Sequence, residues 1–234
     1  VGASANRNNS NNNSFSGIGF LKGNLTDMAF ANSYPTNGRP SGSESLSSSV
    51  GIYGNLNVIF GNRYFIDGSY RISGSSKFGK DRRFAPFWSV GMGWNVHNES
   101  FLSETGWFDI FRIRGSVGYT GSVNFSDYQA ITTYKYSQNN NYLIGMGALP
   151  IAMGNDRLKW QTTVKYNVGV TLEMLSGRLS ANFDIYKEDT KDLLLSISTP
   201  PSMGVSNVMD NLGETGNWGY EWSVSGLLIK SNQL

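Results

Sequence analysis

The sequence predicts an all-β fold in which antiparallel strands cross a membrane as part of a β-barrel. Three observations support this prediction: apolar and polar residues alternate along seven segments, each segment is about ten residues long, and the connections alternate between short and long. Alternating side chains of a strand face opposite sides of its sheet. A tilted strand needs about ten residues to cross a bilayer, whereas strands of soluble proteins more often have five or six.

The alternation is clearest after residue 178. Leu179, Ala181, Phe183 and Ile185 share one face, and the residues between them are mostly polar. Such a strand has one face suited to lipid or a dry core and one suited to water. The seven segments are residues 49–60, 63–73, 86–96, 110–120, 162–172, 176–195 and 218–228.

The connections between these segments differ in length in a regular order. Residues 61–62 and 173–177 are tight hairpins, whereas residues 74–85, 121–159 and 188–217 form long connections. Outer-membrane barrels have short periplasmic turns and long extracellular loops, so all three long connections are expected outside. Residues 97–110 fall on the short side but are too long for a hairpin, and they could carry a single helical turn.

The chain divides into two parts under this interpretation. Residues 1–49 are expected to hold the end of a strand, at 1–5, and then a long extracellular loop, because the tract NRNNSNNNSFSG cannot pack a core. Residues 50–234 are expected to form one partial barrel domain with long extracellular loops. The first residues show no basic segment followed by an apolar one, so no signal peptide is predicted there.

Aromatic residues favour lipid over a dry core as the environment of the apolar face. Rings that prefer the headgroup level lie near the ends of the predicted strands. A soluble sandwich with an aromatic-rich core remains the alternative. The aromatic residues on the apolar face are Tyr64, Trp94, Tyr119, Trp218, Tyr220 and Trp222.

Composition argues against several function classes. The chain has no cysteine and one histidine, so a thiolate metal site, a disulfide framework and a Ser-His-Asp triad are not expected. A net charge of +2 does not suggest a nucleic-acid partner. Glu188, Asp189 and Asp192 in KEDTKD are expected to be a solvated rim rather than catalytic carboxylates. We therefore expect no enzyme activity, no cofactor and no metal.

Candidate substrate contacts come from two regions. The 121–159 connection holds four tyrosines, and exposed loop aromatics can stack on sugar faces or grip peptides. Three arginines lie on the predicted polar face, which would line a water-filled lumen. The basic stretch KFGKDRR (77–83) could touch lipopolysaccharide phosphate or a partner protein, or could be a plain solvated loop. The candidates are Tyr128, Tyr134, Tyr136, Tyr142, Arg71, Arg112 and Arg114.

Several stretches resemble the SusC/RagA family of TonB-dependent outer-membrane transporters of Bacteroidetes. They are YRISGSSKFGKDRRFAPFWSVGMGWNVHNESFL, FRIRGSVGYTGSVNFSDYQA, RLKWQTTVKYNVGVTLEMLSGRLSANFDIYKEDTKDLLL and NLGETGNWGYEWSV, in that order between about residues 50 and 228. Ser73, Gln161 and Trp218 depart from the residues usual in the family, which are Asp, Glu and Lys.

The resemblance implies a 22-stranded barrel, of which this chain would supply seven to eight strands from the C-terminal half. It also implies a plug, a TonB box outside this chain and a SusD-like surface lipoprotein. The expected function is nutrient uptake in the bacterial outer membrane, importing oligosaccharides or peptides, with outer-membrane lipid and lipopolysaccharide around the barrel. The alternatives are a small stand-alone barrel acting as adhesin or anchor, and a soluble carbohydrate-binding β-sandwich.

Overall fold

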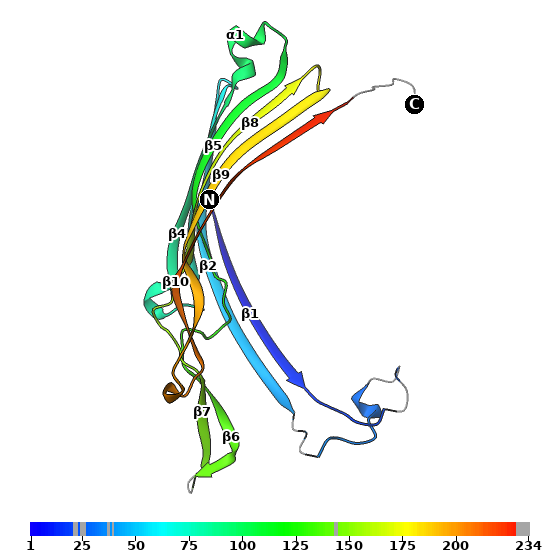
Figure 1. Cartoon of the computed structure of the whole chain (residues 1–234), viewed down its shortest axis with the longest axis vertical. Helices are drawn as coiled ribbons and strands as arrows, with labels where there is room; N and C mark the ends of the chain where they lie inside the picture. Colours follow the sequence, from blue (N-terminus) through cyan, green and yellow to red (C-terminus); the bar gives the residue numbers. More distant parts are fainter. Residues whose placement is uncertain (21–22, 24–26, 37, 39, 143–144, 228–234) are drawn as a thin grey trace.

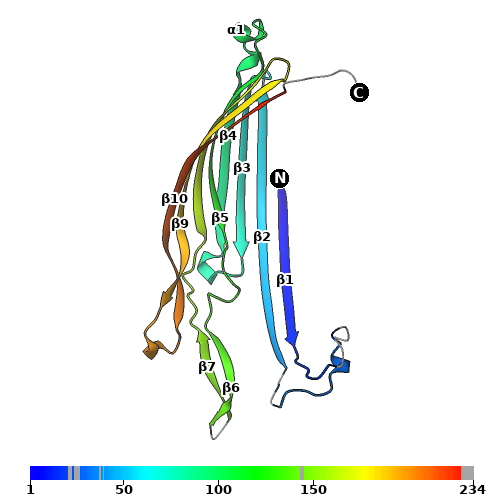
Figure 2. The ribbon, with the colours of Figure 1, turned by 45° about the vertical axis from the view of Figure 1, so that its right-hand side comes forward.

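A computed structural model describes residues 1–20, 23, 27–36, 38, 40–142 and 145–227, and it is dominated by one curved antiparallel sheet (Figure 1). The sheet has eight strands in the order β1-β2-β3-β4-β5-β8-β9-β10, and β6 and β7 form a separate hairpin. Figure 2 shows β1 at one edge of the sheet and β10 at the other. In the described part of the chain these two edge strands do not pair with each other, so the sheet is an open barrel segment.

The strands differ in length. Their bounds are β1 Gly2–Ser14, β2 Ser41–Phe60, β3 Tyr64–Ser75, β4 Phe84–Asn95, β5 Phe108–Ser122, β6 Thr133–Tyr142, β7 Gly145–Ala152, β8 Gln161–Met174, β9 Leu179–Ser198 and β10 Asn207–Gly226. The helical segments are η1 Met28–Phe30, η2 Lys80–Arg82, η3 Val96–Asn98, α1 Ser100–Ser103 and η4 Pro201–Met203. None of the helices in these described residues is long and apolar enough to cross a bilayer.

Connections of the two kinds gather at opposite ends of the sheet, as the alternation of lengths predicts (Figure 1). One end, called the short-connection end, holds residues 61–63, 96–107 and 175–178. The other, called the long-connection end, holds residues 76–83 and 199–206 and the described residues of 15–40 and 123–160. The single helical turn expected between residues 97 and 110 is α1.

The strand register aligns apolar side chains across the whole sheet. Residues paired directly in an antiparallel ladder lie on the same face. One row of paired residues near the middle of the sheet is therefore apolar on every strand except β5, where it contains a glycine. Its members, from β2 to β10, are Val58, Ile66, Met92, Gly115, Val168, Ile185 and Tyr220. We call this side the apolar face and the opposite side the polar face.

Aromatic rings on the apolar face occur at two levels. Tyr64 and Trp94 stack near the short-connection end, with ring centroids 6.3 Å apart. Tyr70, Trp88 and Tyr119 pair across three strands nearer the long-connection end. Trp88 and Trp94 are six residues apart, or about 20 Å along a strand. This spacing suits the apolar band of an outer-membrane barrel, which is about 25 Å tall.

Several strands are longer than the alternation predicts. β1 runs through the Asn/Ser tract to Ser14, and β2 already begins at Ser41, although residues 6–49 were expected to form a loop. All thirteen residues of β1 pair with β2. Backbone hydrogen bonds do not need apolar side chains, so a strand with two polar faces can continue beyond the lipid.

Two of the three long connections between the predicted strands also contain strands. Most of the stretch from residue 188 to 217 belongs to β9 and β10, and only residues 199–206 connect them. Residues 121–159 include the β6–β7 hairpin rather than one extended loop. In both cases the hidden strands carry polar or mixed residues, which give no alternating signal.

The assignment of the two faces gives a direct test in β8. Val168 lies on the apolar face and its neighbour Asn167 on the polar face. Val168→Arg in the full-length protein should destabilise a membrane-inserted barrel by about 2–4 kcal/mol near the bilayer midplane, because the new charge meets lipid. Asn167→Arg, the matched control, should be tolerated. Heat-modifiable gel mobility measures both, and equal tolerance of the two arginines would contradict the face assignment.

Candidate functional site

On the polar face, large side chains lie beside glycines, which leave room for them. One row crosses the sheet with Phe65 beside Gly93 and Arg114 beside Gly169. A Cβ atom on Gly93 would lie 1.8 Å from the Phe65 ring. A Cβ on Gly169 would lie 2.3 Å from Asp184 Oδ1 and 2.8 Å from Arg114 Nε. The glycines therefore let neighbouring side chains lie flat across the sheet instead of projecting from it.

The three candidate arginines all face this side but do not form one site. Arg114 Nη2 lies 2.6 Å from Asp184 Oδ2, and its Nη1 donates to Thr171 Oγ1 at 2.7 Å. Arg112 Nε donates to Asn95 Oδ1 at 2.8 Å, and its guanidinium lies 5.7 Å from the centroid of the Phe65 ring.

Arg71 occupies a different level, nearer the long-connection end. Its Nε donates to Ser73 Oγ at 2.8 Å, and its Nη2 donates to Ser4 Oγ at 3.3 Å. The guanidinium also lies 5.9 Å from the centroid of the Tyr53 ring. Each arginine thus has partners within the sheet, which fixes its side chain on the polar face.

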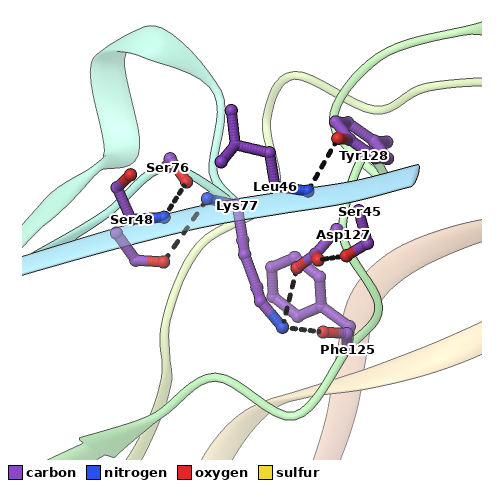
Figure 3. A network of polar contacts seen from close by, with 9 residues as sticks. Ser45, Leu46, Ser48, Ser76, Lys77, Phe125, Asp127 and Tyr128 are labelled. Carbon is purple, nitrogen blue, oxygen red and sulfur yellow. Dashed lines mark hydrogen bonds and ion pairs between the residues drawn. The ribbon is translucent and has the colours of Figure 1, made fainter. Parts of the chain in front are cut away.

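A polar network joins three segments at the long-connection end (Figure 3). Lys77 Nζ lies 3.1 Å from Asp127 Oδ1 and donates to the carbonyl of Phe125 at 2.9 Å. The Ser45 hydroxyl donates to Asp127 Oδ2. The Leu46 amide donates to the Tyr128 hydroxyl at 2.8 Å. We call Ser45, Lys77, Asp127 and Tyr128 the loop latch.

The loop latch covers an exposed strand edge. β3 pairs with β2 only as far as Ser49, so the backbone of β2 beyond that point would face water. Ser76 continues the ladder by donating its amide to the Ser48 carbonyl at 2.9 Å, and Tyr128 accepts from Leu46. Unpaired strand edges invite association with other chains, and such cover prevents it.

A small apolar cluster supports the latch. Phe78 is 1% exposed and Leu158 is fully buried, in a described chain with few buried apolar residues. The Phe78 ring packs at 4.8 Å from Trp160 and 5.1 Å from Phe125, measured between centroids. Gly79 is required here, since a Cβ would lie 1.9 Å from the carbonyl oxygen of Asp156. The 76–83 loop is therefore fixed against the 123–160 connection.

The electrostatics of the latch stabilise the charged carboxylate. The hydrogen bond from Ser45 lowers the pKa of Asp127, and the Lys77 ammonium lowers it further, against the opposing effect of burial. A carboxylate with a depressed pKa in the folded state contributes stability above its unfolded pKa. The contribution is lost as the pH falls through the lowered pKa of the folded protein, so the latch is fully formed at neutral pH.

A second cluster lies at the short-connection end, around Glu99. Glu99 Oε1 accepts from the Tyr64 hydroxyl at 2.8 Å and from Trp94 Nε1 at 3.0 Å, while Oε2 lies 3.3 Å from Arg63 Nη1. The bonds from Tyr64 and then Trp94 lower the pKa of Glu99. This carboxylate ties the aromatic rings of β3 and β4 to the 96–107 connection.

The candidate tyrosines have different roles in the structure. Tyr128 belongs to the loop latch. Tyr134 and Tyr136 are 64% and 71% exposed and share one face of the β6–β7 hairpin. The side chain of Tyr142 lies outside the described residues. The seven sequence candidates are thus spread over two regions, and their contact with a substrate stays a prediction.

The carboxylates of KEDTKD each pair with a lysine. Glu188 pairs with Lys165 at 2.6 Å, Asp189 with Lys187 at 2.9 Å and Asp192 with Lys159 at 2.8 Å, measured between nitrogen and oxygen. No group of three or more metal-ligating side chains occurs within the residues that the structure describes. These ion pairs form a charged band where β8 and β9 extend beyond the rows of apolar residues.

The loop latch was missed by sequence reasoning. Ser45 and Asp127 are 82 residues apart, and nothing local marks either as a partner of the other. One signal existed: Phe78 is an apolar residue between two lysines in a basic loop, which is unusual for a fully solvated turn. A buried Phe78 implies a second segment covering the loop.

Breaking the latch should loosen the 123–160 connection. Asp127→Asn removes the charge that holds Lys77, at a cost on the order of 1 kcal/mol, and trypsin should then cut this connection several-fold faster, at the exposed Lys135 among other sites. Asp156→Asn is the matched control, because this exposed carboxylate of the same connection is in none of the ion pairs found in the described residues. Equal cutting rates for the two variants would show that the latch does not hold the connection.

Comparison with known proteins identifies the fold and its family. Residues 2–230 match the family model described as TonB dependent receptor-like, beta-barrel. TonB-dependent receptor P39 of Formosa agariphila is 30% identical over 198 residues, covering 85% of this chain and 19% of that protein. TonB-dependent receptor SusC of Bacteroides thetaiotaomicron is 33% identical over 184 residues, covering 75% of this chain and 18% of that protein.

A solved structure matches nearly the whole chain. The RagAB peptide importer in its closed-closed state superposes with a TM-score of 0.85 and 25% identity, covering 98% of this chain and 25% of the matched chain. The chain therefore spans only a fifth to a quarter of the length of these relatives. The chain has an open sheet with one apolar and one polar face, and a family model matches its residues 2–230. It therefore belongs to the TonB-dependent receptor β-barrel family of SusC and RagA, in the bacterial outer membrane.

Proposed function

We propose that the chain is the wall and loop region of an outer-membrane transporter that imports oligosaccharides or peptides. The match to the RagAB peptide importer over 98% of the chain carries this proposal, and the similarity to SusC supports it. TonB would act through a part of the protein outside this chain. A SusD-like surface lipoprotein would meet the long-connection end, which we propose faces the cell exterior.

The geometry favours a passage over the two alternative functions. An eight-stranded stand-alone barrel would need its edges β1 and β10 to pair, and in the described residues they do not. A soluble sandwich would need a second sheet over the apolar face, whereas that face is exposed across the described strands, with Val168 and Ile185 each more than 50% exposed. Lipid contact accounts for both observations. The matched family is one of receptors and transporters rather than an enzyme class.

Substrate contact is proposed at the β6–β7 hairpin and along the polar face. Tyr134 and Tyr136 offer two exposed rings on one side of a hairpin that projects from the long-connection end (Figure 1). Rings of this kind can stack on sugars or grip peptide side chains. Arg71, Arg112 and Arg114 would line the passage at successive levels below them. Uptake assays with an oligosaccharide and with a peptide would distinguish the two substrate classes.

The orientation of the chain can be tested with single cysteines, because the chain contains none. In the full-length protein on intact cells, cysteine at the exposed Ser206, in the 199–206 connection, should react with an impermeant maleimide. Cysteine at the exposed Ser176, in the short turn between β8 and β9, should react only after permeabilisation. Labelling of Ser176 with protection of Ser206 would reverse the proposed orientation.

The role of the hairpin tyrosines can be tested by uptake kinetics. Tyr134→Ala combined with Tyr136→Ala should raise the substrate concentration for half-maximal uptake about tenfold, as expected when stacking worth about 1.4 kcal/mol is lost. Leu149→Ala, on the opposite face of the same hairpin and 53% exposed, is the matched control. Surface abundance should be equal in all strains. Unchanged uptake by the tyrosine variant would remove the hairpin from the substrate site.

A further inference from the structure

A pocket of about 440 Å³ lies beside the loop latch, and no role in import has been given to it. Its wall combines apolar groups from Leu46 and Ile131 with the cationic side chains of Lys80 and Arg83. Tyr128, Asp156 and the paired Lys77 and Asp127 of the loop latch also line it. The pocket therefore offers positive charge next to an apolar surface.

Part of the pocket wall lies on the apolar side of the sheet. Leu46 lies on the same face as Val50 and Ile52, because alternate residues of β2 share a face. The 76–83 loop, drawn in teal, bulges from the convex side of the sheet in Figure 1. The convex side of a barrel wall is the side that meets lipid.

Aromatic and apolar groups continue directly below the cations. Phe84, next to Arg83 in the chain, is 66% exposed, and its ring lies across Gly74, where a Cβ would be 2.5 Å from it. Pro86 and then Trp88 follow on the same face of β4. Going down this face, the surface changes from cationic to aromatic to apolar, which matches the polarity profile of an outer-leaflet lipid.

The two cationic side chains have no carboxylate partner in the described residues. Neither Lys80 nor Arg83 takes part in an ion pair within the residues that the structure describes. The backbone of Arg83 is anchored, since its carbonyl accepts from the Ser75 amide at 3.1 Å and from Trp160 Nε1 at 3.3 Å. Asp81 and Asp156 reduce the net charge of the region, but Arg82 and Arg157 leave it positive.

We propose that this pocket binds a phosphate of a phosphorylated glycolipid of the outer leaflet, such as lipopolysaccharide. Lys80 and Arg83 would contact the phosphate oxygens, and an acyl chain would lie along Phe84, Pro86 and Trp88. Charge complementarity and the apolar surface beneath favour a lipid over a protein partner. The inference rests on the outward orientation of the long-connection end, which the cysteine labelling tests separately, and it does not depend on import.

The test measures binding of lipid A to the purified full-length transporter in detergent. Bisphosphorylated lipid A should bind wild type at least about tenfold more tightly than dephosphorylated lipid A, because two charge-assisted contacts are lost. Lys80→Gln combined with Arg83→Gln should abolish this preference. Lys135→Gln combined with Arg178→Gln removes the same charge from the β6–β7 hairpin and the short-connection end and should keep it.

Heat-modifiable mobility of each variant reports folding. If the double variant does not fold, Lys80→Gln and Arg83→Gln are measured singly, with a loss of about threefold expected for each. Arg83→Lys should restore most of the binding. Equal binding of both lipids by wild type, or unchanged binding by the glutamine variants, would overturn the proposal. Loss of a co-purifying lipoprotein from the glutamine variants, with unchanged lipid A binding, would also overturn the proposal, because the loop would then be a protein-docking surface.

Discussion

The structure depends on one constraint: inside a bilayer, every backbone N–H and C=O group must find its partner within the protein. An antiparallel ladder satisfies this requirement for every inner strand, and it sets the register from β2 through β10. Once the register is set, a slip of one residue in any strand would exchange its two faces. The apolar row through Val168 and the polar row through Arg114 are therefore consequences of the same hydrogen bonds.

Glycine allows the polar face to hold large groups without filling the space above it. Gly93 accepts the Phe65 ring and Gly169 accepts the Arg114–Asp184 pair, both at distances that a Cβ atom would prevent. The charges are thus neutralised within the wall, and their side chains lie along the sheet. Such an arrangement leaves the space above the polar face open, since these side chains do not project into it.

The sequence predicts the membrane-crossing part of this fold better than its outer part, for a physical reason. Alternation is informative only where one face meets lipid and the other meets water, as in residues 162–172. Beyond the lipid both faces are wet, so β1 continues through an Asn/Ser tract and β9 continues past Glu188 without an alternating pattern. The match of the family model to residues 2–230 confirms the family resemblance, whose motifs lie largely in the alternating strands.

The candidate site could be predicted only in part. The three arginines lie on the polar face as the alternation requires, because strand periodicity decides the face of a side chain. Their partners depend on cross-strand register, and the loop latch depends on two connections meeting in space. Tyr128 illustrates the difference, since its hydroxyl is used by the Leu46 amide, 82 residues earlier. A tyrosine count in a loop cannot separate such a structural ring from an exposed one.

The 76–83 loop and the 123–160 connection are packed together at the long-connection end. The 76–83 loop has Phe78 packed against Trp160 and Lys77 paired with Asp127, and its Lys80 and Arg83 line the pocket beside the latch. The same connection that supplies Asp127 also carries the β6–β7 hairpin with its exposed tyrosines. The hairpin and the 76–83 loop are therefore both attached to the 123–160 connection, one as part of it and the other through the loop latch.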